Sequence, residues 1–403
     1  MPAGRIFVAD KGDIRIMEVY LDNAATTLPF PEVRDIMMDT LQKHYGNPSS
    51  KHIMGMDAEN FVKDARKKIA ASMKAEEKEI FFTSGGTESN NQALIATAFA
   101  NQRSGKHIIS TRIEHSSVYN PLCFLEEEGF EVTYLNVDQN GHILLDEFEE
   151  SIRDDTILVS VMYVNNEIGT VQDIAKISEI IKEKKKDIIF HVDAIQAYGK
   201  YKIYPKKLGI DLLSVSGHKI HGPKGIGFLY IRDKVKIKPF ILGGGQQKGM
   251  RSGTENVPGI AGLGKAAELI YHNHEEKMQS MYELKAYFVQ KLLEIDGIFI
   301  NGLENLEIKE TSPSIISASV EGIRSEVLLH ALADRGIYVS SGSACSSNHP
   351  ALSGTLQAIG VKKELLDSTI RFSLSVYSTK EEVEYTISVL KELLPMLRRY
   401  RRQ

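Results

Sequence analysis

The sequence lacks the features that mark several classes of protein. Its 403 residues contain only two cysteines, Cys123 and Cys345, in dissimilar surroundings, so no disulfide framework is expected. It has no run of about 18 or more apolar residues that would predict a membrane-spanning helix. Its first residues also lack the compact apolar core of a signal peptide. We therefore expect a cytoplasmic protein that has no membrane partner.

Strong charge and metal-binding motifs are equally scarce. The formal net charge is −4, which gives no reason to expect direct binding to nucleic acid. Twelve histidines are present, but the sequence contains neither an HExxH nor a CxxC motif, so we expect no metal site. The basic end, "LRRYRRQ", fits the solvated C-terminal end of a helix better than a binding tail.

What the sequence does contain is a long alternation of strands and helices. Helices are predicted over 88–101 and 174–186. Strands are predicted over 79–84, 106–111, 130–137, 156–164, 187–194, 211–217 and 225–232. Strands that alternate with helices form a mostly parallel sheet that is covered on both faces. The predicted fold class is therefore α/β.

The pattern changes near residue 260 and predicts a second, smaller α/β unit. Residues 261–295 fit one long helix or two joined helices. The unit then continues with strands over 314–322 and 369–376, a helix over 325–336 between them, and an amphipathic helix over about 380–400.

We therefore expect two domains, with the boundary near residue 275. The large domain covers 25–275 and the small C-terminal domain covers 276–403. Residues 1–24 form an N-terminal segment that joins the small domain. Within it, residues 1–16 precede a second methionine, Met17, and the sequence leaves open whether they are an extension.

Polar groups follow the predicted strands at the points where the strands end. In open α/β sheets, ligands bind beyond the carboxyl ends of the strands. The glycine-rich turn "GGTESNN" follows the strand at 79–84 and opens a helix, and backbone N–H groups in such a place suit a phosphate. The later strands are followed by further candidate site residues: His115, Asn165, Asn166, Asp193, Gln196 and Lys219.

Each of these residues alone has an ordinary explanation. Asp193 could cap a helix, Lys219 could be a surface lysine, and Asn165 and Asn166 could complete a turn. Their shared location at one sheet edge favours a site. A phosphate cradle, an acid and a lysine are what pyridoxal phosphate requires: the lysine forms a Schiff base, and the acid pairs with the ring nitrogen.

At these residues the chain resembles the class V aminotransferases among the fold type I pyridoxal phosphate enzymes. More narrowly, it resembles the cysteine desulfurases of the NifS/IscS type. The matching motifs run in order from Tyr20 and are "YLDNAATT", "YGNPSS", "TSGGTESNN", "VNNEIGT", "HVDAIQAYGK", "SGHKIHGPKGIGFLYIR", "GGGQQKGMRSGTEN", "SSGSACSS" and "TIRFSL". The resemblance implies a mostly parallel central sheet sandwiched by helices, a smaller C-terminal domain, and release of sulfur from L-cysteine with L-alanine as product.

The resemblance also assigns roles around the cofactor ring. Lys219 is expected to carry the cofactor as a Schiff base, and Asp193 to pair with the ring nitrogen. Gln196 is expected on the side of the ring hydroxyl, and Asn166 beside cofactor and substrate. His115 is expected to stack on the ring and to take part in proton transfer.

Further roles concern the phosphate and the substrate. The resemblance implies that the phosphate is held by Gly86, Thr87, Ser216 and His218. Thr254, in "RSGTEN", is expected to reach the phosphate of the partner subunit, which implies a homodimer. Arg371 is expected to clamp the substrate carboxylate with two parallel hydrogen bonds, a geometry that lysine cannot reproduce.

The last assigned residue is Cys345, which lies among serines and glycine that cannot bury it, whereas structural cysteines usually pack among apolar side chains. The resemblance makes it the thiolate that attacks the substrate sulfur and carries a persulfide. A sulfur-acceptor protein, an iron–sulfur scaffold or a tRNA thiolase, would receive the sulfur. A free thiol has a pKa of about 8.5, so activation is expected, with His115 or the substrate amine taking the proton. Cys123, in the apolar stretch "PLCFLEEEGF", is expected to be a packing residue.

Two alternatives stay open on the sequence alone. The same scaffold could catalyse another reaction, as a selenocysteine lyase or an aminotransferase, and an aminotransferase does not need Cys345 as a persulfide carrier. The chain could also be a non-catalytic partner protein that keeps the fold. The joint presence of Lys219, Asp193 and Cys345 argues against the second alternative.

Overall fold

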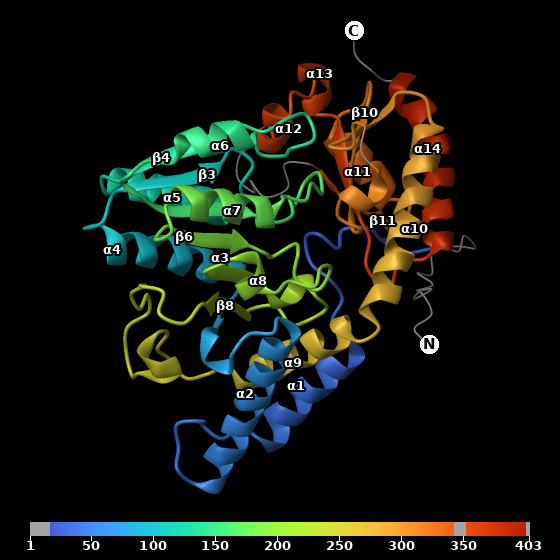
Figure 1. The fold of residues 1–403 in the computed structure, drawn as a ribbon. Helices are drawn as coiled ribbons and strands as arrows, with labels where there is room; N and C mark the ends of the chain where they lie inside the picture. Colours follow the sequence, from blue (N-terminus) through green and yellow to red (C-terminus); the bar gives the residue numbers. More distant parts are fainter. Residues whose placement is uncertain (1–16, 306, 342–351, 400–403) are drawn as a thin grey trace.

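A seven-stranded sheet forms the centre of the protein in a computed structural model that describes residues 17–305, 307–341 and 352–399 (Figure 1). The strands lie in the order β2-β8-β7-β6-β5-β3-β4. They are β2 (Ile80–Thr83), β3 (His107–Thr111), β4 (Glu131–Leu135), β5 (Thr156–Met162), β6 (Ile189–Asp193), β7 (Leu212–Ser216) and β8 (Gly227–Ile231).

All pairs in this sheet are parallel except those made by β8, which runs antiparallel to β2 and β7. The connection from β7 to β8, residues 217–226, is shorter than the dozen or so residues that a parallel crossover needs. The other strands are separated by helices, as the sequence predicts. The expectation of a mostly parallel α/β sheet is therefore confirmed.

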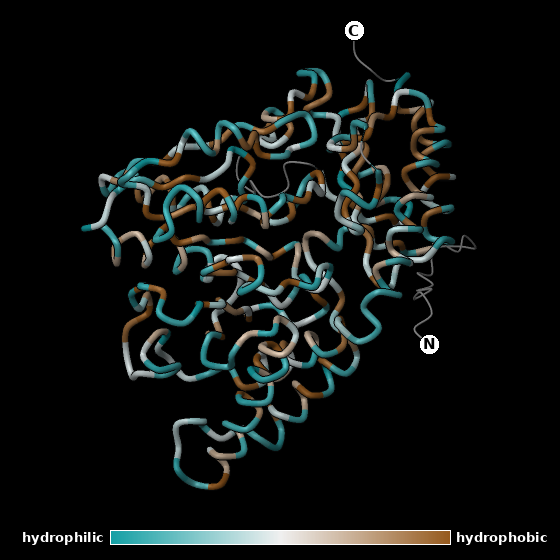
Figure 2. The backbone as a smooth tube through the Cα atoms, in the orientation of Figure 1, coloured by the Kyte–Doolittle hydropathy of each residue, from teal (hydrophilic) through white to brown (hydrophobic). Residues whose placement is uncertain are grey.

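The two faces of the sheet pack in two different hydrophobic cores. Successive side chains of a strand point to opposite faces, and on β7 Leu213 and Val215 lie in one core while Leu212 lies in the other. The helices around them are α5 (Ser116–Glu127), α6 (Leu145–Ser151), α7 (Ile174–Lys184), α8 (Pro205–Leu208) and α9 (Val257–Tyr271). In Figure 2 the strands of the sheet carry long hydrophobic stretches between more polar helices.

Three helical segments depart from the sequence expectation. The helix predicted over 88–101 begins earlier and consists of α3 (Gly86–Asn91), a π-helical turn (Gln92–Ala96) and α4 (Thr97–Asn101). Two amphipathic helices that the sequence analysis did not assign, α1 (Pro31–Lys43) and α2 (Ile53–Ser72), both pack against α9.

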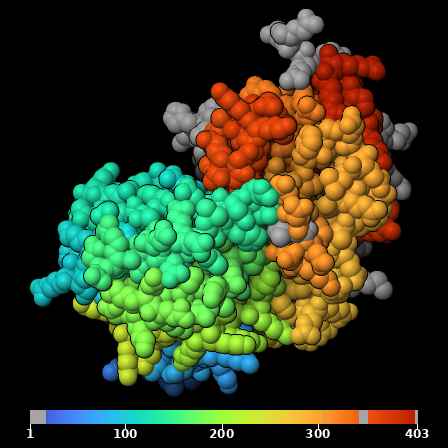
Figure 3. Space-filling view, turned by 45° about the horizontal axis from the view of Figure 1, so that its top comes forward, coloured from blue at the N-terminus to red at the C-terminus, as the bar shows by residue number. Residues whose placement is uncertain are grey.

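The second part of the chain, from α10 to α14, contains a four-stranded antiparallel sheet in the order β12-β13-β10-β9. Its strands are β9 (Ile298–Asn301), β10 (Ile315–Val320), β12 (Ser340–Ser341) and β13 (Thr369–Ser373). Its helices are α10 (His274–Leu293), α11 (Ser325–Ala333), α12 (Gly354–Ala358), α13 (Lys363–Leu366) and α14 (Lys380–Arg399). Figure 3 shows this part, in orange and red, along one side of the molecule.

The helical pattern at 261–295 is resolved into two helices. Helix α9 ends at Tyr271 and α10 begins at His274, and between them Asn273 has a φ of 50°. Asparagine is one of the few residues that adopt this left-handed conformation readily. The chain therefore turns at Asn273, close to the predicted domain boundary near 275, which itself stays a prediction.

The N-terminal segment connects the two parts. Strand β1 (Val19–Tyr20) pairs in parallel with β11 (Ile337–Tyr338), and Leu21 lies in the core of the second part. A few residues later the backbone N–H of Thr27 donates to the carbonyl oxygen of His218, directly after β7. Among the described residues, every helix is too short or too polar to cross a membrane.

Candidate active site

Most of the residues predicted for the site surround one cavity of about 280 Å³, at the carboxyl ends of β5, β6 and β7. Of the predicted site residues, those that line it are Gly86, Thr87, His115, Asn166, Asp193, Gln196, Ser216, His218, Lys219 and Arg371. Three do not. Asn165 is buried, and its side-chain oxygen accepts hydrogen bonds from the backbone N–H groups of Glu167 and Ile168. Thr254 is exposed on the loop before α9, and Cys345 lies outside the described residues.

Asp193 is the last residue of β6, and every residue of this strand is buried. Its carboxylate accepts hydrogen bonds from the side-chain amide of Asn90, at 2.8 Å, and from the backbone N–H of Ile195, at 2.9 Å. Burial raises the pKa of Asp193, and the nearby charges of His115 and Lys219 oppose this shift. A positive partner would favour the ionised form of this buried carboxyl group.

His115 precedes α5, and its ring caps the first turn of this helix. Nδ1 accepts a hydrogen bond from the backbone N–H of Ser117, at 3.1 Å, and lies 2.9 Å from the Ser117 hydroxyl. Because a backbone N–H can only donate, the neutral ring carries its proton on Nε2. Burial lowers the pKa of His115, so the neutral form prevails at neutral pH.

Two residues that sequence reasoning did not single out join these groups. The amide of Asn90 donates both to Asp193 and to the Ser117 hydroxyl, at 2.9 Å, and Ser117 in turn contacts His115. Both lie beside predicted residues, Asn90 within "TSGGTESNN" and Ser117 just after His115. Their position within strand-end segments was the available signal.

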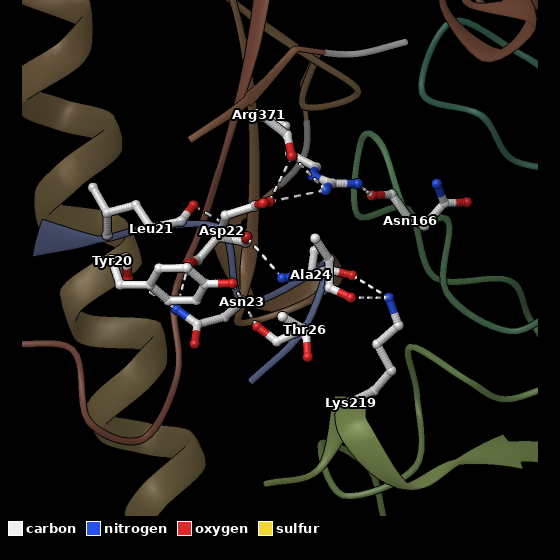
Figure 4. A network of polar contacts seen from close by, with 12 residues as sticks. Tyr20, Leu21, Asp22, Asn23, Ala24, Thr26, Asn166, Lys219 and Arg371 are labelled. Atoms are coloured by element: carbon white, nitrogen blue, oxygen red, sulfur yellow. Dashed lines mark hydrogen bonds and ion pairs between the residues drawn. The ribbon is translucent and has the colours of Figure 1, made fainter. Parts of the chain in front are cut away.

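Lys219 lies in the short turn Gly217–Lys219 that follows β7. Its Nζ donates to the carbonyl oxygens of Ala24, at 2.5 Å, and Ala25, at 2.8 Å (Figure 4). The amide of Gln196 also donates to Ala24, at 2.9 Å. The N-terminal segment thus orients the lysine amine toward the cavity.

The turn after β2 brings Gly86 and Thr87 to the cavity, where a helical run begins. This turn lies directly on the sheet, since a side chain at Gly227 of β8 would come within 2.9 Å of the Cα of Gly85. Ser216 at the end of β7 and His218 complete this side. Burial, assisted by nearby lysines, lowers the pKa of His218 to about 4.

Arg371 on β13 brings the second part of the chain to the cavity. It is only 5% exposed. NH1 donates to the carbonyl oxygen of Asn166, at 2.8 Å, and NH2 donates to Asp22, at 3.2 Å, and to the Ser340 hydroxyl, at 3.1 Å (Figure 4). Its Nε is buried and has no acceptor in the described part of the chain.

The structure describes the surroundings of Cys123 and of Thr254, whereas Cys345 lies outside the described residues. Cys123 on α5 is half-buried, beside the hydroxyls of Tyr119 and Tyr134. The loop of Thr254 is tied to α3 by Arg251, whose Nε donates to Glu88 at 2.8 Å. The role of Thr254 toward a partner subunit stays a prediction, as does that of Cys345.

Comparisons with known proteins agree with this geometry. Residues 19–386 match the family model of the class V aminotransferases. The chain is 45% identical to the cysteine desulfurase IscS of Dictyoglomus turgidum, over 94% of this chain and 95% of that protein. It is 46% identical to the cysteine desulfurase IscS of Methanosarcina thermophila, over 94% of this chain and 93% of that protein.

Solved structures show the same fold. A NifS-like protein superposes with a TM-score of 0.89 at 39% identity, covering 94% of this chain and all of that one (100%). A NifS-like protein from Rickettsia africae superposes with a TM-score of 0.83 at 34% identity, covering 94% and 99%. The predicted fold type I architecture is therefore confirmed. The chain belongs to the class V aminotransferase family and, within it, to the cysteine desulfurases of the IscS and NifS type.

Proposed function

We propose that this protein is a cysteine desulfurase that uses pyridoxal phosphate. In the proposed reaction the C–S bond of L-cysteine breaks, a bond forms between that sulfur and the sulfur of Cys345, and the β-carbon gains a proton to give L-alanine. The observation that carries the proposal is the cavity, where the amine of Lys219, the buried carboxyl of Asp193 and the buried guanidinium of Arg371 face the same space.

The residues around the cavity fit this cofactor. Several groups around the cavity are donors that suit a phosphate: the backbone N–H of Gly86, the hydroxyls of Thr87 and Ser216, and the ring of His218. Nδ1 of His218 is buried without a partner in the described part of the chain. Lys219 would hold the aldehyde carbon. When bound, the cofactor supplies an electron sink for the α-carbon of the substrate.

The chain's own residues would then do the acid–base work and the binding. Asp193 is buried with a raised pKa, so a protonated ring nitrogen is the partner that would keep it ionised. His115 presents an N–H at Nε2 and can give a proton there, while Ser117 fixes its ring through Nδ1. Arg371 has one buried donor, Nε, that a substrate carboxylate can satisfy.

We also propose that the protein works as a homodimer and passes its sulfur to an acceptor protein. Large apolar side chains are exposed on α1, on α2 and on the loop before α9: Leu41, Ile53, Met56, Phe240 and Leu242. A contiguous exposed apolar patch marks a surface that associates with other proteins, and we propose that these side chains belong to one. Thr254 lies on the same segment between β8 and α9 as Phe240 and Leu242, which supports its predicted reach into a second subunit.

The division into domains is likewise part of the proposal. The large domain covers 25–275, the small domain covers 276–403, and residues 1–24 join the small one. A separate group of buried apolar residues supports it, since the core that contains residues of α10, α11 and α14 also contains Val19 and Leu21.

The test uses L-cysteine and the Cys345→Ser variant. We expect the wild-type protein, loaded with pyridoxal phosphate, to release alanine and to gain the mass of one sulfur atom on Cys345. Cys345→Ser should lose sulfur release by at least roughly a hundredfold, because an alcohol cannot take the place of the thiolate nucleophile. Its cofactor absorbance should be unchanged.

Cys123→Ser is the matched control, because it removes the other cysteine of the chain, which is half-buried on α5. It should keep full sulfur release. Full activity of Cys345→Ser would contradict the proposed mechanism. Formation of 3-mercaptopyruvate with transfer of the amino group to the cofactor, in place of alanine, would favour an aminotransferase.

A further inference from the structure

We propose that Asp22 is the counter-ion that holds Arg371 before an amino acid binds, and that it weakens the hold of Arg371 on the carboxylates of substrate and product. Asp22 would thus be a positioning residue that sets how readily the product leaves. The inference rests on the proposed function, in which Arg371 binds the substrate carboxylate.

The first support is the geometry around the guanidinium. NH2 of Arg371 lies 3.2 Å from Oδ1 of Asp22 and 3.1 Å from the Ser340 hydroxyl. The Ser340 hydroxyl donates to the same Oδ1 at 2.6 Å, so the three groups form a closed triangle. Only NH1 is directed elsewhere, to the carbonyl oxygen of Asn166.

The second support is that Asp22 is the one carboxylate ion-paired with Arg371 in the described part of the chain. Glu167 is also near, but burial raises its pKa and its carboxyl group contacts the Ser353 hydroxyl. Tyr20 does not compensate the charge, since burial raises the pKa of Tyr20 to about 12 and keeps its hydroxyl protonated at neutral pH. A buried cation without a partner is strongly destabilising.

The third support is the difference in burial between the two partners. The Arg371 side chain is 6% exposed, whereas that of Asp22 is 21% exposed. Asp22 is therefore partly hydrated, and it can neutralise the guanidinium without occupying its buried donor, Nε. A carboxylate that enters from the cavity would meet a cation that is already half neutralised, so its binding is weaker than to an unpaired arginine.

The location of Asp22 gives this arrangement a further consequence. Ala24 and Ala25 follow Asp22 closely in the same segment, and their carbonyl oxygens hold the amine of Lys219. L-Alanine carries the same carboxylate as L-cysteine, and a moderate hold on Arg371 allows it to leave. The segment that orients the lysine therefore also limits product retention.

The experiment measures binding of L-alanine to the loaded enzyme by the shift of its thermal unfolding midpoint and by calorimetry. Asp22→Asn keeps an oxygen acceptor for Ser340 and Arg371 but removes the charge. We expect this variant to have a lower midpoint than the wild type without amino acid, and to bind L-alanine roughly three- to tenfold more tightly. Saturating L-alanine should restore most of the lost midpoint.

Asp367→Asn is the matched control, because Asp367 pairs with Arg324 at 2.8 Å on the exposed surface of the same part of the chain. It should leave the affinity for L-alanine unchanged. An Asp22→Asn variant that binds L-alanine no more tightly than the wild type overturns the proposal. If the variant folds poorly, L-alanine or acetate in the medium should restore the folded fraction, and failure of both to do so also overturns it.

The wild-type protein separates this inference from the function on which it rests. If L-alanine and L-cysteine leave the wild-type midpoint unchanged, the proposed function fails, and the role of Asp22 falls with it. If the wild type responds and Asp22→Asn responds equally, only the role of Asp22 is refuted.

Discussion

Glu114 has a buried carboxyl group near the site, and its surroundings decide its charge state. Its Oε1 accepts hydrogen bonds from the backbone N–H of Met162, at 3.0 Å, and from the Thr111 hydroxyl, at 2.8 Å. Its Oε2 is buried without a partner in the described part of the chain. Burial raises the pKa of Glu114 to about 8, so this carboxyl group is neutral at physiological pH.

A testable consequence is a stability difference that depends on pH. Between about pH 5 and 8 the folded protein binds a proton at Glu114 that the unfolded chain has lost, so folding is favoured less as pH rises. We expect the unfolding free energy of the wild type to fall relative to that of Glu114→Gln, by on the order of 2–5 kcal/mol over this window. Urea titrations at several pH values would measure it. Glu150→Gln, at an exposed position, is the control, and parallel curves for wild type and Glu114→Gln would contradict the expectation.

Individual residues also show where sequence reasoning stops. The strand-end rule predicts one location for Asp193, Lys219 and Asn166, and all three line one cavity, because parallel strands end at one edge. Asp22 was within a quoted motif, but its partner Arg371 is 349 positions away along the chain. No local spacing predicts a pair that forms only because the N-terminal segment lies beside β13.

At the scale of elements, the periodicity of the sequence predicts most strands and helices, but it does not predict how closely two helices pack against each other. The sequence gives no sign that α9 packs with its backbone against α2, yet a side chain at Gly264 would come within 2.6 Å of the Cα of Ala65. The antiparallel direction of β8 likewise depends on the length of one connection. Such features follow from the packing of whole elements and become visible only in three dimensions.

The close approach of α9 and α2 can be tested with Gly264→Ala. Alanine is favoured over glycine inside a helix by about 1 kcal/mol, so a free helix would be stabilised. Here the methyl group would overlap backbone atoms that cannot move aside, and we expect a net loss of about 1–3 kcal/mol of unfolding free energy. Chemical denaturation would measure it. Gly354→Ala in α12, where the added methyl group meets open space, should be neutral or slightly stabilising. Equal effects at the two glycines would contradict the packing argument.

At the scale of the whole molecule, the two parts of the chain meet at a buried lysine. Lys285 on α10 donates to the Thr311 hydroxyl, at 2.6 Å, and to the carbonyl oxygen of Ser312, at 2.7 Å. The backbone N–H of Ser312 in turn donates to Gly169, in the loop of the central sheet that carries Asn166. In the described part of the chain the hydrogen-bond partners of this amine are neutral oxygens, and through Ser312 it links the second part to the loop of Asn166.

This junction should make stability rise with pH. Burial lowers the pKa of Lys285 to about 7, well below its ordinary value of 10.5. Between about pH 7 and 10 the unfolded chain therefore binds a proton at Lys285 that the folded protein lacks, so the contribution of this residue to stability increases as pH rises. Lys285→Met removes the titrating amine. We expect its unfolding free energy to rise less steeply with pH than that of the wild type, by on the order of 2–5 kcal/mol in total from pH 7 to 10.

Chemical denaturation at a series of pH values would measure the unfolding free energy of variant and wild type. The difference between the two curves isolates Lys285 from the other lysines and tyrosines that titrate in the same range. Lys291→Met is the matched control, because Lys291 lies on the same helix but pairs with Glu294 at the surface. Its curve should run parallel to that of the wild type. A Lys285→Met curve that is equally parallel would show that the amine at the junction keeps its charge when the protein folds.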